Sequence, residues 1–147
     1  MEKLGFQKRE ILTSRVEKAQ EAQEEASEQF RSALDRFRAV LGTEGGELEE
    51  KYETLRAEFE QSEERAQAVR DRIDAVEDVS GALFEEWEEE LEQYRSQELR
   101  RRSRQRLAET RRLYVELIRK MHQAEERMEP VLAAFQDQVL YLKHNLN

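Results

Sequence analysis

The 147-residue sequence contains no cysteine, one proline and five glycines. Without cysteine the chain has no disulfide framework, no thiolate nucleophile and no cysteine ligand for zinc. With so few prolines and glycines, long helices meet few interruptions. No apolar run approaches the roughly 20 residues that a membrane-spanning helix needs. The sequence therefore predicts neither a disulfide-stapled fold nor a helix that crosses a bilayer.

Charge dominates what is present. Charged residues make up 40% of the chain, hydrophobic residues make up 37%, and the net charge is −9. An acidic excess of this size argues against general binding to nucleic acid, because the phosphates would be repelled. A chain of this length is expected to form a single domain over residues 1–147.

The stretch from Leu48 to Tyr94 shows the strongest pattern. Alternating steps of four and three residues land on an apolar side chain at most positions, which is typical of a long helix that packs along its length. The positions are Leu48, Tyr52, Leu55, Phe59, Ser62, Ala66, Val69, Ile73, Val76, Ser80, Leu83, Trp87, Glu90 and Tyr94. Gly81 lies inside this helix, where a bend is one alternative and an uninterrupted helix the other.

Two further stretches carry a similar pattern. The first contains Leu12, Val16, Ala19, Gln23, Ala26, Phe30, Ala33, Phe37 and Val40. It stops at a glycine-rich segment, residues 42–46, which predicts a tight reversal. The second contains Leu99, Leu107, Leu113, Leu117, Met121, Ala124, Met128, Val131, Phe135, Val139, Leu142 and Leu146. Pro130 should kink or restart this last helix.

These patterns predict an all-α fold: an elongated antiparallel three-helix coiled-coil bundle with helices at about 8–41, 47–95 and 98–146. Folding the helices back on one another places Phe30, Phe59 and Phe135 at one level. The first helix then begins level with Gly81 and Leu113. Residues 82–112, the hairpin tip, should therefore project as two helices alone.

The hairpin tip carries the candidate site. Its outgoing, acidic arm, residues 84–92, is rich in glutamate, and its returning, basic arm, residues 99–106, is rich in arginine. One interpretation is a partner-binding surface, in which arginine guanidinium groups donate paired hydrogen bonds and aromatic side chains pack against the partner. The other is that the two arms neutralise each other and Trp87 packs on Leu107. The candidate residues are Phe84, Trp87, Tyr94, Arg100, Arg101, Arg102 and Arg104.

No catalytic, cofactor-binding or metal-binding residue is expected. His122 and His144 are isolated, and metal sites need converging ligands. The glycines of residues 42–46 are not followed by the Lys-Ser or Lys-Thr of a phosphate-binding loop. We therefore expect no enzymatic activity and no cofactor.

Five segments resemble the bacterial domain-of-unknown-function family 2959 (DUF2959), and together they span essentially the whole chain. They are residues 8–12, 45–49, 82–87, 128–132 and 141–147, the last reading Tyr-Leu-Lys-His-Asn-Leu-Asn. The resemblance implies a Gram-negative envelope protein, periplasmic or lipoprotein-like, made with an export signal. It brings no established activity and no catalytic residues.

The combined expectation is a non-enzymatic structural or interaction protein of the bacterial cell envelope, bound to an envelope protein partner. The alternative is a membrane-associated helical module whose basic face binds anionic lipid. The chain could be a monomer, since its apolar faces can close within one polypeptide. Phe84 and Tyr141 lie outside these predicted apolar faces and are expected to be exposed, so they would also allow a homodimer.

Overall fold

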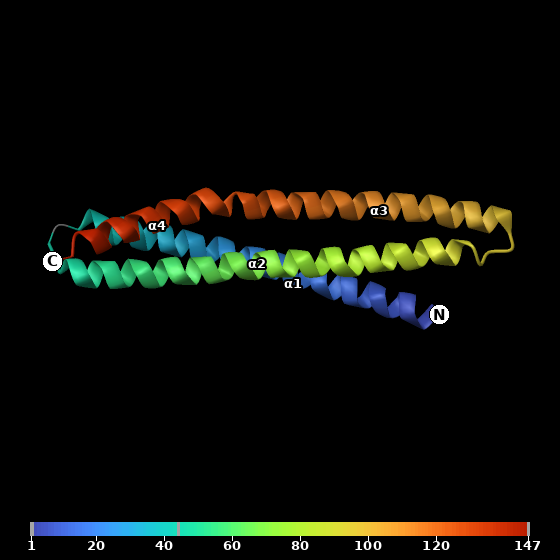
Figure 1. Cartoon of the computed structure of the whole chain (residues 1–147), viewed down its shortest axis with the longest axis horizontal. Helices are drawn as coiled ribbons and strands as arrows, with labels where there is room; N and C mark the ends of the chain where they lie inside the picture. The colour runs from blue at the N-terminus through green and yellow to red at the C-terminus, as the bar shows by residue number, and fades with distance from the viewer. Residues whose placement is uncertain (1, 44, 147) are drawn as a thin grey trace. The chain divides into compact units, whose positions relative to one another are not determined.

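The computed structural model describes residues 2–43 and 45–146, and these ranges contain helices and no strand. The helices are α1 (Glu2–Gly42), α2 (Leu48–Leu91), α3 (Gln97–Glu126) and α4 (Met128–His144) (Figure 1). Their sequences are dominated by alanine, glutamate, arginine, leucine and glutamine, which lose little free energy in a helix. The predicted all-α fold is therefore confirmed.

Glycine makes the reversal between α1 and α2 possible. Gly45 and Gly46 have φ angles of 87° and 84°, a left-handed conformation that side chains with a Cβ rarely adopt. Two side chains bond to the backbone here. The Thr43 hydroxyl donates to the carbonyl of Ala39 at 2.6 Å, and the Lys51 ammonium donates to the carbonyl of Thr43 at 2.8 Å. The sequence predicted this reversal correctly.

The expected third helix is divided in two by Pro130. Proline has no backbone N–H, and its ring clashes with the carbonyl four residues earlier, which belongs to Glu126. Glu126 is the last residue of α3, and α4 begins at Met128. Pro130 lies in the first turn of α4, where a missing N–H costs little. Of the two alternatives, the helix restarts.

The chain forms two compact units. The first unit comprises Met1–Ala19 and Asp71–Gln123, and the second comprises Gln20–Arg70 and Ala124–Asn147. Each unit therefore receives part of α1, part of α2 and one returning segment. The expectation of a single domain stays a prediction.

In the first unit, α1 packs against the hairpin of α2 and α3. Leu12 of α1, Ile73 of α2 and Met121 of α3 are all buried. The Arg15 guanidinium donates to the carbonyl of Ala75 at 3.0 Å, which ties α1 to α2. The α1 helix begins at Glu2 rather than near Lys8, and its Lys8 pairs with Glu86 of α2. It therefore reaches part of the range 82–112, which the sequence predicted to consist of two helices alone.

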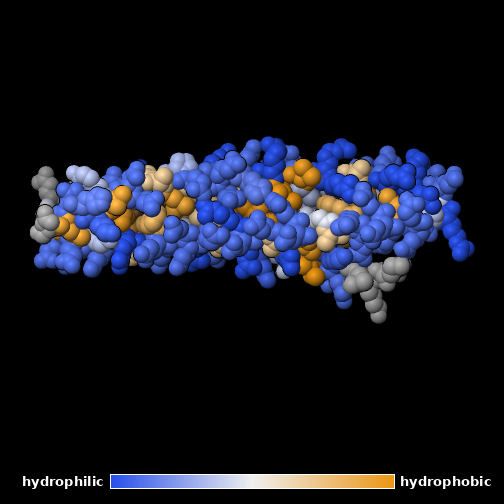
Figure 2. All heavy atoms as spheres, viewed as in Figure 1, coloured by the Kyte–Doolittle hydropathy of each residue, from blue (hydrophilic) through white to orange (hydrophobic). Residues whose placement is uncertain are grey.

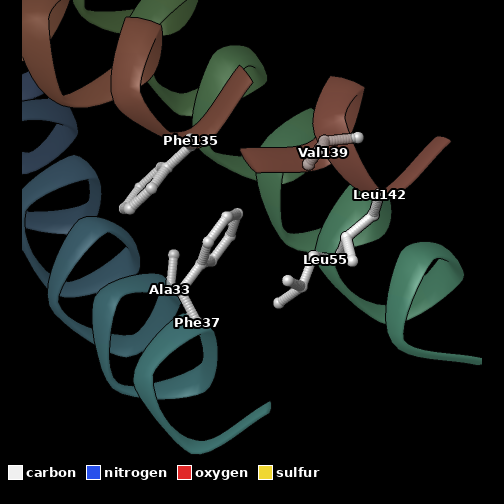
Figure 3. Packing of buried hydrophobic residues seen from close by; sticks show 6 residues of the cluster. All are labelled: Ala33, Phe37, Leu55, Phe135, Val139 and Leu142. Carbon is white, nitrogen blue, oxygen red and sulfur yellow. The ribbon is translucent and has the colours of Figure 1, made fainter. Parts of the chain in front are cut away.

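The second unit is built around aromatic rings (Figure 3). Phe135 of α4 stacks on Phe37 of α1 with ring centroids 4.4 Å apart, and meets Phe30 edge-on at 6.3 Å. Leu55 of α2 is fully buried in the same cluster, and Phe59 packs against it. The rest of the buried cluster is Ala33, Val139 and Leu142. The predicted grouping of Phe30, Phe59 and Phe135 is confirmed.

The predicted apolar faces agree with burial along most of α1 and α2. Between Leu12 and Val40, every predicted position is buried or half-buried, including Gln23. On α2 the exposed members are Leu48 at its start and Tyr94 beyond its end. The α3 pattern is wrong at three positions, because Leu99 and Leu113 are 51% and 71% exposed and Ala124 is exposed as well.

The surface is mainly hydrophilic on the face shown in Figure 2, where apolar side chains form small separate patches. This agrees with helices that bury a narrow apolar stripe and leave the remaining faces to charged residues. None of the described helices is long and apolar enough to cross a membrane.

Candidate partner-binding surface at the α2–α3 turn

Residues 92–96 join α2 to α3 without glycine or proline, slightly earlier in the chain than expected. The backbone N–H of Tyr94 bonds to the carbonyl of Leu91 at 3.4 Å, which closes the end of α2. Ser96 caps α3, because its hydroxyl accepts a hydrogen bond from the N–H of Leu99 at 3.2 Å. The acidic Glu98 follows in the first helical turn, where the helix dipole favours negative charge.

Trp87 is half-buried in the hairpin. Its indole Nε1 donates a hydrogen bond to the Ser103 hydroxyl at 2.9 Å, so α2 and α3 are joined by side chains. The ring packs against the buried cluster of Phe84, Leu91 and Leu107. The Arg9 guanidinium lies 5.5 Å from the ring centroid. The interpretation that Trp87 packs with Leu107 is therefore confirmed.

Phe84 corrects the prediction of an exposed aromatic residue. It is 6% exposed, and its ring meets Tyr114 edge-on at a centroid distance of 5.8 Å. Phe84 directly follows Leu83, so it lies beside the apolar face that the sequence predicted for this helix. The physical reason for its burial is that α3 presents Tyr114 to that side of α2. Phe84 therefore supports the hairpin from within.

The four candidate arginines have different surroundings. Arg100 is half-buried and donates to the carbonyl of Tyr94 at 2.7 Å, and its Nε is buried without a hydrogen-bond partner. Arg101 and Arg102 both reach Glu98, at 3.2 Å and 3.1 Å. Arg104 is exposed. Arg100 therefore belongs to the turn itself, whereas the other three project their charges outward.

An exposed set of apolar and cationic residues remains at the end of the hairpin. Tyr94 is 37% exposed and Leu99 is 51% exposed. We call Tyr94, Leu99, Arg101, Arg102 and Arg104 the turn surface. Tyrosine and arginine are enriched at the energetic centres of protein interfaces, because each combines large contact area with directed hydrogen bonds.

An ion pair joins α2 and α3 at the hairpin tip. Arg111 of α3 lies 3.2 Å from Glu88 of α2, and both side chains are about half exposed. Exposed pairs of this kind contribute about 1 kcal/mol or less. Glu88 of the acidic arm is therefore paired across the hairpin with an arginine beyond the basic arm, while Arg101 and Arg102 of the basic arm bond within α3.

The two histidines lie on different helices. His122 pairs with Glu77 across α3 and α2, and His144 is exposed. Among the described residues, no group of three or more histidines and acidic residues could hold a metal ion. On the surface of α3, the hydrogen bond from Arg119 lowers the pKa of Glu116.

Sequence reasoning missed a groove between α2 and α3 in the first unit. Its volume is about 500 Å³, and its lining includes Gly81, Phe84, Tyr114, Val115 and Ile118. A signal for Tyr114 was present, because steps of seven residues back from Leu142 land on Phe135, Met128, Met121, Tyr114 and Leu107. All of these are buried or half-buried.

Comparison with known proteins places the chain in a family without assigning it a function. No curated protein and no solved structure matches it. The family DUF2959, described as "Protein of unknown function", matches residues 1–147. The match covers every residue of the sequence, and the chain therefore belongs to the DUF2959 family.

Proposed function

We propose that this protein is a non-enzymatic interaction protein that binds a protein partner through the turn surface. The observation that carries the proposal is the contrast between the exposed turn surface and the fixed hairpin beneath it. Tyr94 and Leu99 expose apolar area, and Arg101 and Arg102 stand beside them with one shared acidic partner, Glu98.

Preorganisation supports this assignment. The Trp87–Ser103 hydrogen bond and the Arg100–Tyr94 hydrogen bond hold the two helices and the turn in place before any partner arrives. A surface that is already ordered loses less conformational entropy on binding. The same side chains would otherwise need to be immobilised at a cost of about 0.5–1.5 kcal/mol each.

We also propose the finer architecture expected from the sequence, an elongated antiparallel three-helix coiled-coil bundle with a projecting two-helix tip. Its support comes from within each unit. In the first unit α1 contacts the hairpin through Lys8 and Glu86, and in the second unit Phe30 of α1 contacts Phe135 of α4. Small-angle X-ray scattering tests the arrangement: a compact particle would contradict it.

A location in the bacterial cell envelope is part of the proposal and rests on the family resemblance alone. Cell fractionation of a bacterium that expresses the full-length gene product is the direct measurement. Recovery in the periplasmic or membrane fraction would agree with the proposal, and recovery only in the cytosol would contradict it.

Site-specific photo-crosslinking tests the turn surface. A photoreactive amino acid replaces Tyr94, and in a matched control it replaces Tyr141, which is also exposed but belongs to the second unit. We expect a discrete protein adduct from position 94 that the charge reversals Arg101→Glu and Arg104→Glu abolish. Identical adducts from both positions, or none from position 94, would contradict a partner site at the turn.

The alternative is binding of anionic lipid by the same arginines. Co-sedimentation with vesicles of phosphatidylglycerol and phosphatidylcholine separates the two. Binding to these vesicles that disappears in the charge-reversed variant would favour the lipid interpretation, because basic residues gain about 1 kcal/mol each near an anionic surface. No sedimentation, together with the position-94 adduct, would favour the protein partner.

A further inference from the structure

We propose that residues 8–16 of α1 form a releasable strap on the hairpin of α2 and α3 in the first unit. We call this segment the α1 strap. Charged side chains hold it on an acidic stretch of α2, and its release uncovers one side of Trp87. The proposal concerns a different surface from the turn surface and does not depend on the proposed function.

A polar contact to α2 lies at each end of the α1 strap. At one end the Lys8 ammonium pairs with the Glu86 carboxylate. At the other end the Arg15 guanidinium donates to the carbonyl of Ala75 at 3.0 Å. The residue numbers rise along α1 as they fall along α2, so the two helices run antiparallel here. The residues between these contacts, including the buried Leu12, therefore lie along α2 between Ala75 and Glu86.

A third contact places the α1 strap over Trp87. The Arg9 guanidinium lies 5.5 Å from the centroid of the indole ring, within the range at which a cation is attracted to an aromatic face. The indole is also held by the Ser103 hydroxyl and by the apolar cluster of the hairpin, and neither belongs to α1. Release of the α1 strap therefore exposes more of the ring while the hairpin beneath it stays joined.

Apolar packing contributes little to the attachment of the α1 strap. Among residues 8–16, all of which the structure describes, Leu12 is the only buried apolar side chain, and Ile11 is 43% exposed. The α1 strap contains no aromatic residue, whereas farther along the same helix Phe30 and Phe37 pack on Phe135. Segments with few buried apolar contacts open at a lower free energy than the rest of a protein. The α1 strap is therefore the part of α1 that opens most readily.

Opposite charge makes the attachment sensitive to ionic conditions. Residues 8–16 contain more basic than acidic residues, although the whole chain has a net charge of −9. Residues 75–91 of α2 contain glutamates and an aspartate but no lysine or arginine. The pair of Lys8 and Glu86 is only partly shielded from water, so dissolved salt weakens it. Ionic strength should therefore set how often the α1 strap opens.

Thiol modification of the intact chain tests the proposal, since the native sequence contains no cysteine. In Leu12→Cys the thiol is buried while the α1 strap is attached, so N-ethylmaleimide, which is uncharged, reaches it only on opening. We expect slower modification than in the exposed Ile11→Cys, and a rate that rises as sodium chloride increases from about 10 mM to about 150 mM. Ala33→Cys, buried in the second unit, reports on global unfolding and should not accelerate.

Charge reversal in the Leu12→Cys protein identifies the contact responsible. Lys8→Glu should raise the modification rate by about fivefold or more, because attraction to Glu86 becomes repulsion. Lys18→Glu is the matched control, since it makes the same charge change at an exposed position of α1 beyond the α1 strap. It should leave the rate unchanged. Combining Lys8→Glu with Glu86→Lys should restore the slow rate, because the pair forms again with its charges exchanged.

Three results would overturn the proposal. The first is a rate at position 12 that responds neither to salt nor to Lys8→Glu. The second is an equal effect of Lys8→Glu and Lys18→Glu, or a charge exchange that restores nothing. The third is a parallel acceleration at position 33, which would mean that the whole chain unfolds instead of releasing the α1 strap.

Discussion

Trp87 and Ser103 join α2 to α3 through a hydrogen bond of 2.9 Å, and the surrounding residues explain why this bond stabilises the hairpin. The indole is half-buried against Phe84, Leu91 and Leu107, so few water molecules can replace the serine oxygen. A buried donor that loses its acceptor costs about 1–3 kcal/mol, which exceeds the net gain from an average hydrogen bond. The pair therefore stabilises the hairpin beneath the turn surface.

Ser103→Ala tests this contribution. We expect the free energy of unfolding to fall by about 1 kcal/mol, because the Trp87 N–H loses its acceptor while helix propensity improves slightly. Urea denaturation followed by circular dichroism measures the change. Ser14→Ala, at an exposed position of α1, is the control. Equal stability of the two variants would show that the hydrogen bond contributes nothing.

At the level of the helices and turns, glycine has opposite effects on stability at two positions in the chain. Gly46 has a φ angle of 84° in the reversal between α1 and α2, whereas Gly81 lies in the right-handed helix α2. Adding a methyl group strains the backbone in the first case and removes excess unfolded-state entropy in the second. The sequence alone shows both as glycines, and the φ angle distinguishes them.

Alanine substitution at both glycines gives a prediction with opposite signs. We expect Gly46→Ala to destabilise the protein by about 1–2 kcal/mol, because it forces an L-residue into the left-handed region. We expect Gly81→Ala to stabilise the monomer by about 1 kcal/mol, because it raises helix propensity without a clash. Thermal unfolding at low protein concentration measures both. A loss of stability at Gly81→Ala would contradict the open environment of that position.

How far the elements could be predicted depends on how many apolar residues each helix has. Between Leu12 and Val40 nearly every third or fourth residue is apolar, so the buried face of α1 was correct throughout. In residues 99–112 charged residues displace most apolar ones, and counting back by fours from Leu117 reached Leu113. The structure buries part of Tyr114 instead.

The candidate site was predictable in composition but not in detail. The concentration of arginine and aromatic residues singled out the hairpin, and the turn surface lies there. Helical periodicity could not reveal that Phe84 points inward, because its burial depends on Tyr114 from another helix. The groove above Gly81 was equally hidden, since it depends on which faces of α2 and α3 meet.

For the whole molecule, the excess of negative charge is the dominant electrostatic property. The net charge of −9 disfavours the folded chain through self-repulsion, and salt screens this repulsion. Ion pairs such as Arg65 with Glu25 are exposed and contribute little stability that salt could remove. Salt should therefore weaken the repulsion between like charges more than it weakens the attraction within the ion pairs.

Thermal unfolding in sodium chloride tests that balance. We expect the melting temperature to rise as salt increases from about 10 mM to about 150 mM, over which the Debye length falls from about 30 Å to about 8 Å. The double variant Glu24→Gln and Glu28→Gln, at exposed positions of α1, should show a smaller rise. A melting temperature that falls with salt would mean that the ion pairs outweigh the repulsion.

Trp87 is the single tryptophan of the chain, and it is half-buried against the apolar cluster of the hairpin. Its intrinsic fluorescence therefore reports on one known location without any label. Emission should shift to longer wavelength when the hairpin opens, whereas circular dichroism averages over all four helices. A difference between the two signals during denaturation would reveal whether this region unfolds together with the rest of the chain or before it.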